Sequence, residues 1–87
     1  MTMVSRMVTV SNPSGFHIRP AGVLVKAAEH CSSKVEIIYE YNIINARSLL
    51  NILAASIPCG SQIELRCTGP NEKEDLDAME EALKHLE

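Results

Sequence analysis

The chain has 87 residues, of which 46% are hydrophobic, and a formal net charge of −3 at pH 7. This length leaves room for a single domain over residues 1–87, and with one Phe, two Tyr and no Trp its core must be aliphatic. The acidic balance argues against a general nucleic-acid binder, because such proteins need clustered Lys and Arg.

Neither a membrane segment nor a cysteine-based site is expected. No apolar run approaches the roughly 20 residues that span a bilayer, and residues 1–10 lack the pattern of a signal peptide. We therefore expect a cytoplasmic protein that does not insert into the membrane. Cys31, Cys59 and Cys67 are odd in number and lack Cys-x-x-Cys spacing, so we expect reduced, buried or half-buried thiols and no metal or cofactor.

The first half of the chain carries three strand signals and one helix signal. Residues 7–10 are short and β-branched, which predicts a strand that stops at the turn-forming residues after it. Apolar residues at helical spacing predict a helix over about residues 18–30. Alternating polarity over residues 35–41 predicts a second strand, and residues 43–45 predict a third, with a tight turn around Tyr41 and Asn42.

The second half predicts a short helix, a strand and a long helix. Ser48 can cap a helix that ends before Pro58, and residues 62–67 alternate as a fourth strand. Asn71 and Glu74 have the spacing of a capping box in front of an amphipathic helix, whose buried stripe is Leu76, Met79, Leu83 and Leu86. The order βαββαβα predicts an open-faced α+β sandwich, with three helices on one face of a four-stranded, mostly antiparallel sheet.

The residues with the most chemical information are those at the start of the first predicted helix. The N–H groups of a helix start have no partner within the helix, so the N–H of Ile18 belongs to a potential anion site. His17 lies directly in front of it and can offer a ring nitrogen as a nucleophile. The planar guanidinium of Arg19 suits a phosphoryl group on that nitrogen, and Pro20 loses no hydrogen bond in the first turn.

Two segments resemble one known family. Residues 15–21, Gly-Phe-His-Ile-Arg-Pro-Ala, resemble the Gly-Leu-His-Ala-Arg-Pro-Ala signature of HPr, the phosphocarriers of the bacterial phosphotransferase system. Residues 45–50, Asn-Ala-Arg-Ser-Leu-Leu, resemble the segment around the regulatory serine of that family. The distance between the two segments also fits, and the similarity extends over nearly the whole chain. The resemblance implies the same βαββαβα sandwich.

The resemblance also implies a function for the first segment. His17 would be phosphorylated by enzyme I, itself charged from phosphoenolpyruvate, and would pass the group to enzyme IIA domains in sugar uptake. Such a protein is a phosphoryl carrier rather than an enzyme with turnover. Arg19 would stabilise the phosphate, and Ser14 would cap the helix or contact the phosphate. Phe16 and Ile18 are bulkier than the Leu and the Ala or Thr that are usual in the family, and we expect this difference to alter docking.

Ser48 has two interpretations. The resemblance implies that an HPr serine kinase/phosphorylase modifies it and that, in Gram-positive bacteria, the modified form binds a catabolite-control regulator. A plain helix cap is the alternative, since serine is a favoured residue at that position. Phosphate at a helix start is compatible with folding, so the sequence leaves both interpretations open.

A docking surface is expected beside His17. Leu49, Leu50 and Leu53 cannot all face inward on one short helix, so some of them should be exposed and bind a partner, the alternative being a crowded core. Basic side chains that would steer an acidic partner toward this surface are Arg19, Lys26 and Arg47.

Two other functions remain open at this stage. A sibling of HPr could keep the fold and His17 yet serve nitrogen or carbon signalling, and phosphorylation by the enzyme I of one branch alone would separate the two. A ferredoxin-like ligand-binding or structural module would need neither His17 nor Arg19, and a lack of phosphoenolpyruvate-dependent phosphorylation would favour it. His30 and His85 have no comparable neighbours, and we expect them to be solvated residues at helix ends.

Overall fold

The computed structural model describes residues 2–86. Along the chain, the elements are β1 (Met3–Thr9), α1 (Ile18–Glu29), β2 (Lys34–Tyr39), β3 (Asn42–Asn45), α2 (Leu49–Ala55), β4 (Gln62–Thr68) and α3 (Glu72–Leu83). The predicted βαββαβα order is therefore confirmed. Within the described residues, no helix is long and apolar enough to cross a membrane.

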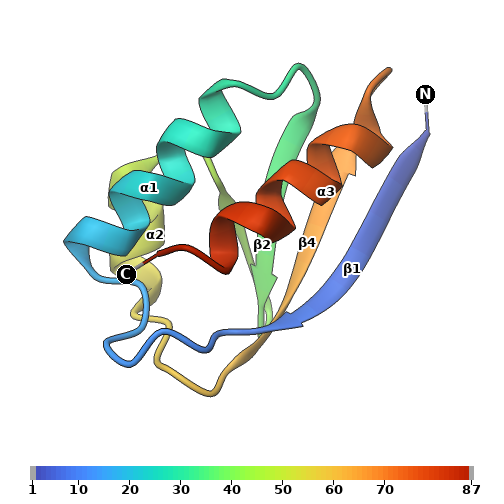
Figure 1. Ribbon diagram of the computed structural model, residues 1–87. Coiled ribbons are helices and arrows are strands. Elements are labelled where there is room, and N and C mark those ends of the chain that lie inside the picture. Colours follow the sequence, from blue (N-terminus) through green and yellow to red (C-terminus); the bar gives the residue numbers. More distant parts are fainter. Residues whose placement is uncertain (1, 87) are drawn as a thin grey trace.

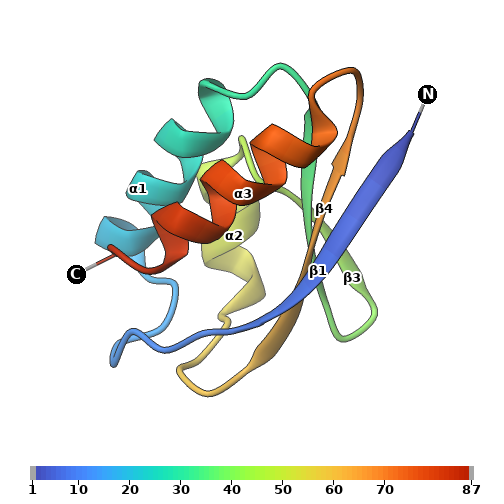
Figure 2. The same ribbon diagram turned by 45° about the vertical axis from the view of Figure 1, so that its right-hand side comes forward.

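The strands of residues 2–86 form one antiparallel sheet in the order β1-β4-β2-β3, and the helices α1, α2 and α3 lie against one of its faces (Figure 1, Figure 2). In the two central strands, alternate side chains point into the space between the layers and are almost fully buried: Val35, Ile37, Ile63, Leu65 and Cys67. These side chains, with Leu24 of α1 and Met79 of α3, form the expected aliphatic core. The open-faced α+β sandwich is as predicted.

The first strand is longer than its sequence pattern indicates. β1 begins at Met3 and pairs along its whole length with β4, whereas the prediction began at residue 7. Its early residues look polar because Arg6 occupies a position on the helix side of this edge strand. There the Arg6 guanidinium donates to Asp77 at 3.0 Å and to Glu80 at 2.5 Å, both on α3. An ion-paired arginine thus replaces the apolar residue that the alternation requires.

The hairpin between β2 and β3 turns one residue earlier than expected. Tyr39 pairs with Asn42, so Glu40 and Tyr41 form the turn and Asn42 belongs to β3. Glu40 has a φ of +56°, the left-handed conformation that a two-residue hairpin needs and that glycine or asparagine usually supplies. Tyr41 is fully exposed at the tip.

The start of α3 also differs from its prediction. Asn71 is the N-cap, but its side chain donates to Ser32 Oγ at 3.1 Å and makes no capping hydrogen bond within residues 2–86. The prediction of a capping box is therefore wrong. Asp75 in the first turn accepts from the Ser33 N–H at 2.9 Å. Burial by itself would raise the pKa of Asp75, but its hydrogen bonds with Ser33, Cys31 and Ser32 outweigh this and lower it. Polar side chains of α3 therefore hold the loop between α1 and β2.

The cysteines follow the prediction at two positions. Cys31 and Cys67 are buried, and burial raises the pKa of both thiols to about 11, which keeps them protonated. Cys59 is exposed, contrary to the expectation of burial, because the loop after α2 carries it on the surface.

Candidate functional site

His17 is the N-cap of α1. Its backbone is extended, with φ −93° and ψ −167°, and its carbonyl accepts the first helical hydrogen bond from the Ala21 N–H at 2.9 Å. The imidazole is exposed and, within residues 2–86, makes no capping hydrogen bond to the helix. Since the first N–H groups of a helix have no intrahelical acceptor, those of Ile18 and Arg19 remain available beside the imidazole. The start of α1 can therefore bind an anion.

The loop in front of His17 is fixed against the segment that follows α2. The Phe16 N–H donates to the Ile57 carbonyl at 2.9 Å, and the Phe16 side chain is buried. Gly15 has a φ of +66°, and a Cβ at this position would lie 2.5 Å from the Ile57 carbonyl oxygen and 3.0 Å from Pro58 Cα. Only glycine fits between the two segments. The close approach holds the backbone of His17 in place while leaving its ring exposed.

The side chains predicted to surround the phosphoryl group lie on the same part of the surface. Arg19 is exposed in the first turn of α1 and has no ion pair within the described part of the chain, and Ile18 is 65% exposed. Ser14 is exposed and shares an open pocket of about 350 Å³ with His17. The other residues that line this pocket are Phe16, Leu53, Ser56, Ile57 and Pro58. The structure thus brings the loop, the helix start and α2 together.

The leucines of α2 are divided between core and surface. Ile52 is the fully buried residue of this helix, whereas Leu49 and Leu53 are half-buried against the core. Leu50 is 79% exposed. The expectation that the three leucines cannot all face inward is confirmed, and Leu53 is the one that lines the pocket with His17. At the start of the helix, Ser48 Oγ accepts from the Asn51 N–H at 3.2 Å, as predicted for a cap.

The structure does not bring Arg47 to His17. The Arg47 guanidinium donates to the carbonyls of Ala28 at 3.0 Å, Cys31 at 2.5 Å and Ser33 at 3.1 Å. These carbonyls lie at and beyond the C-terminal end of α1, whose 12 residues separate them from His17 by about 18 Å. Lys26 is exposed in the last turn of the same helix. Arg47 is therefore a tie between the end of α1 and the start of α2 rather than part of the histidine site.

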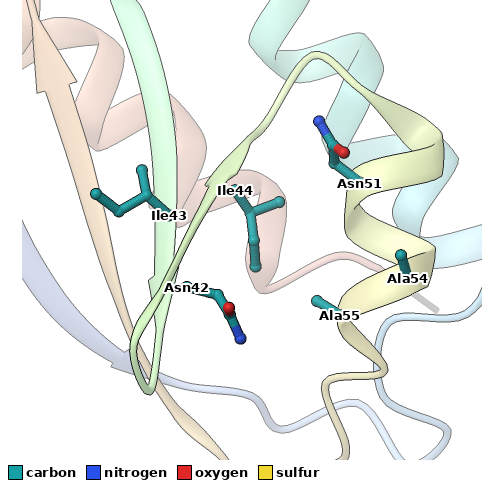
Figure 3. A pocket seen from close by; sticks show the side chains of 6 residues that line it. All are labelled: Asn42, Ile43, Ile44, Asn51, Ala54 and Ala55. Carbon is teal, nitrogen blue, oxygen red and sulfur yellow. The ribbon is translucent and has the colours of Figure 1, made fainter.

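A second pocket, of about 270 Å³, lies between β3 and α2 (Figure 3). Ile44 points toward α2 in this view, whereas Ile43 points to the other side of β3. The residues that line it carry amides and aliphatic groups but no ionisable or nucleophilic side chain: Asn42, Ile43, Ile44, Asn51, Ala54 and Ala55. This pocket therefore offers no group that could carry out group-transfer chemistry.

Two residues of the site had no signal in the sequence analysis. Ile57 supplies the carbonyl that fixes Phe16, and Asn12 donates from Nδ2 to the Gly15 carbonyl at 2.5 Å. The pattern Asn12-Pro13 indicates a turn, but it does not indicate that the Asn12 side chain is buried inside it.

Comparisons with known proteins agree with this geometry. A family model described as "PTS HPr component phosphorylation site" matches residues 4–85. The chain belongs to the HPr family. HPr of Treponema pallidum (strain Nichols), described as "Phosphocarrier protein HPr", is 38% identical to it over 78 residues, which are 90% of this chain and 89% of the relative. HPr of Buchnera aphidicola subsp. Acyrthosiphon pisum is 34% identical over 85 residues, 98% of this chain and 100% of the relative.

The structural likeness covers the same length. The crystal structure of a phosphocarrier protein HPr from Bacillus anthracis matches with a TM-score of 0.88 at 29% sequence identity, covering 94% of this chain and 98% of that one. An HPr is a phosphocarrier of the phosphotransferase system, so the role of this chain is to carry a phosphoryl group.

Proposed function

We propose that His17 accepts a phosphoryl group from enzyme I charged by phosphoenolpyruvate and transfers it to enzyme IIA domains for sugar uptake in the cytoplasm. The observation that supports this most directly is the position of the exposed imidazole at the start of α1, where it caps nothing within residues 2–86. In the first transfer, a bond forms between phosphorus and a ring nitrogen while the bond from phosphorus to enzyme I breaks. The second transfer repeats this exchange with the imidazole as the leaving group.

The neighbours of His17 supply charge stabilisation. The phosphoryl oxygens carry negative charge throughout the transfer, and the N–H groups of Ile18 and Arg19 can donate to them. The guanidinium of Arg19 is exposed in the same turn and can form two parallel hydrogen bonds to phosphate. Ser14, which carries a hydroxyl, lines the same pocket as His17. Ser14, Ile18 and Arg19 are all exposed, so the core does not have to rearrange for them to contact the phosphate.

Partner docking uses the surface around this site. Leu50 is exposed and Leu53 lines the pocket of His17, so α2 presents an apolar surface beside the reactive ring. Leu49 is half-buried and contributes its outer part. Arg19 and Lys26, exposed on α1, would steer an acidic partner toward it. Arg47 adds only its charge, since its guanidinium is held by carbonyls of the loop.

Ser48 is the proposed regulatory residue. It lies at the start of α2, where added negative charge is favourable to the helix, and directly precedes the apolar docking surface. An HPr serine kinase/phosphorylase would place the phosphate there, and a catabolite-control regulator would bind the product. Phosphate at this point puts a charge among apolar contacts and so opposes the docking of enzyme I.

The proposed function is tested by incubating the protein with enzyme I and phosphoenolpyruvate. We expect the mass of the protein to rise by one phosphoryl group, the added mass to disappear in acid, and the modification to map to His17. A mass that does not change, or an acid-stable modification on another residue, would contradict the proposal. Adding an enzyme IIA domain should then return the protein to its original mass.

A further inference from the structure

We propose that Asn12 is a positioning residue for phosphoryl transfer, acting through the loop that presents His17; this inference rests on the proposed function. Asn12 is buried, with 7% of its surface exposed. Its Nδ2 donates to the Gly15 carbonyl at 2.5 Å, and the Gly15 N–H donates to the Asn12 carbonyl at 3.1 Å. The turn over residues 12–15 is therefore closed by one hydrogen bond from the backbone and a second from the Asn12 side chain.

The hydrogen bond from the Asn12 side chain fixes the orientation of the peptide group between Gly15 and Phe16, which precedes His17. The carbonyl that accepts from Asn12 belongs to the same peptide group as the Phe16 N–H, which donates to Ile57 at 2.9 Å. One peptide group is thus held at both of its polar atoms, by residues on opposite sides of it. His17 follows after a single buried residue, Phe16. A rotation of this peptide group would move the His17 backbone and with it the ring, relative to the N–H groups of α1.

The other polar atom of Asn12 makes the carboxamide costly to bury. Asn12 Oδ1 is buried and has no hydrogen-bond partner among the described residues. An unpaired buried acceptor opposes folding, whereas an apolar side chain of similar size would fill the same space without that cost. The useful atom is therefore Nδ2, and what it does is orient the Gly15 carbonyl. Orientation matters here because phosphoryl transfer depends strongly on the alignment of the attacking atom.

The experiment compares Asn12→Leu, which removes the donor, with Asn12→Asp, which keeps the size of the side chain and replaces the donor by an acceptor. Ser11→Ala, at an exposed position of the same loop, is the matched control. The initial rate of phosphorylation is measured over a range of enzyme I concentrations, together with the melting temperature. We expect both Asn12 variants to lose on the order of ten-fold in the rate at saturating enzyme I, because small misplacements of a reacting atom are costly. The half-saturating concentration should change less than about two-fold, because the docking residues are untouched.

A structural role alone would lower the melting temperature without changing the rate per folded molecule. The rates are therefore measured at a temperature where circular dichroism shows each variant to be folded. A saturating rate equal to that of the wild type, or an effect confined to the half-saturating concentration, would overturn the inference. Failure of both variants to fold would also overturn it, by showing that Asn12 stabilises the loop as a whole. Failure of the wild type to accept a phosphoryl group on His17 would instead refute the proposed function.

Discussion

Helices α1 and α2 begin with the same backbone arrangement and different caps. In both, the residue before the helix is extended and its carbonyl accepts the first helical hydrogen bond, from Ala21 to His17 at 2.9 Å and from Ile52 to Ser48 at 3.1 Å. Ser48 Oγ also accepts from the Asn51 N–H at 3.2 Å. The His17 side chain makes no such bond within residues 2–86 and is exposed.

The difference between these caps separates an open helix start from a closed one. At α2 a side chain already satisfies one of the first N–H groups, so an arriving anion would have to displace it. At α1 the first N–H groups have no side-chain acceptor from the cap, and the cap residue itself carries a nucleophilic ring. The loop before α1 therefore has to be fixed by other means, which are the Phe16–Ile57 hydrogen bond and the turn at Asn12.

The largest effect should come from removing the ring at the open helix start. We expect His17→Ala to abolish phosphorylation by enzyme I, while the far-ultraviolet circular dichroism and melting temperature change little because the side chain is exposed. His85→Ala is the control, since His85 is also exposed but pairs with Glu81 on α3. Mass spectrometry after incubation with phosphoenolpyruvate measures both. Continued phosphorylation of His17→Ala would show that the cap residue of α1 is not the phosphoryl acceptor.

The second largest effect concerns Arg19. Arg19→Ala should slow phosphorylation at saturating enzyme I by about a hundred-fold, since removing a donor to the moving charge typically has an effect of that order. Arg19→Lys keeps the charge but not the planar pair of donors, and should recover only part of the rate. Rapid-quench kinetics distinguish a slower phosphoryl transfer from weaker binding of enzyme I. A change confined to the half-saturating concentration of enzyme I would assign Arg19 to docking.

A charge at the closed helix start should act mainly on docking. Ser48→Asp places a carboxylate where the helix dipole favours it, so we expect the melting temperature to be kept. The same charge borders Leu50, so the half-saturating concentration of enzyme I should rise by about ten-fold, with a smaller change in the saturating rate. Phosphorylation of this variant at the wild-type rate would leave Ser48 as a plain cap.

The leucines next to Ser48 provide a smaller, paired test. Leu50→Asp changes an exposed side chain and should weaken enzyme I binding by about five-fold, equivalent to roughly 1 kcal/mol, with little loss of stability. Leu49→Asp changes a half-buried side chain packed against the core and should lower the free energy of unfolding. Titration calorimetry and urea denaturation measure the two quantities. Equal losses of stability would show that Leu50 also packs in the core.

The smallest effect is expected for removal of the Ser48 hydroxyl. Ser48→Ala loses the hydrogen bond to Asn51 and should lower the free energy of unfolding by about 1 kcal/mol. For a domain of this size, this corresponds to a fall of roughly 4–8 °C in the melting temperature. The rate at which His17 is phosphorylated should not change. A lower rate would mean that α2 contributes to more than docking.

Local patterns in the sequence were sufficient for the order of the elements and for the position of His17 at a helix start. The alternation of apolar and polar residues over 62–67 and the helical spacing of apolar residues after Ile18 are patterns of neighbouring residues in the chain. They can therefore be recognised without knowing which residues are in contact in the folded protein. The Ser48 cap is local too, since its partner lies three residues away. The phosphoryl-accepting role of His17 stays a prediction until its modification is measured.

The tertiary structure alone decided what several polar side chains do. Arg6 faces the helices because Asp77 and Glu80 lie opposite it, more than 70 positions away in the chain. The Arg47 guanidinium donates to carbonyls at and beyond the end of α1, a role that its sequence position does not indicate. The turn that Asn12 closes belongs to a loop whose Phe16 N–H donates to the Ile57 carbonyl, far along the chain. A polar residue can be buried only where a partner is brought to it, and its own sequence neighbourhood does not contain that information.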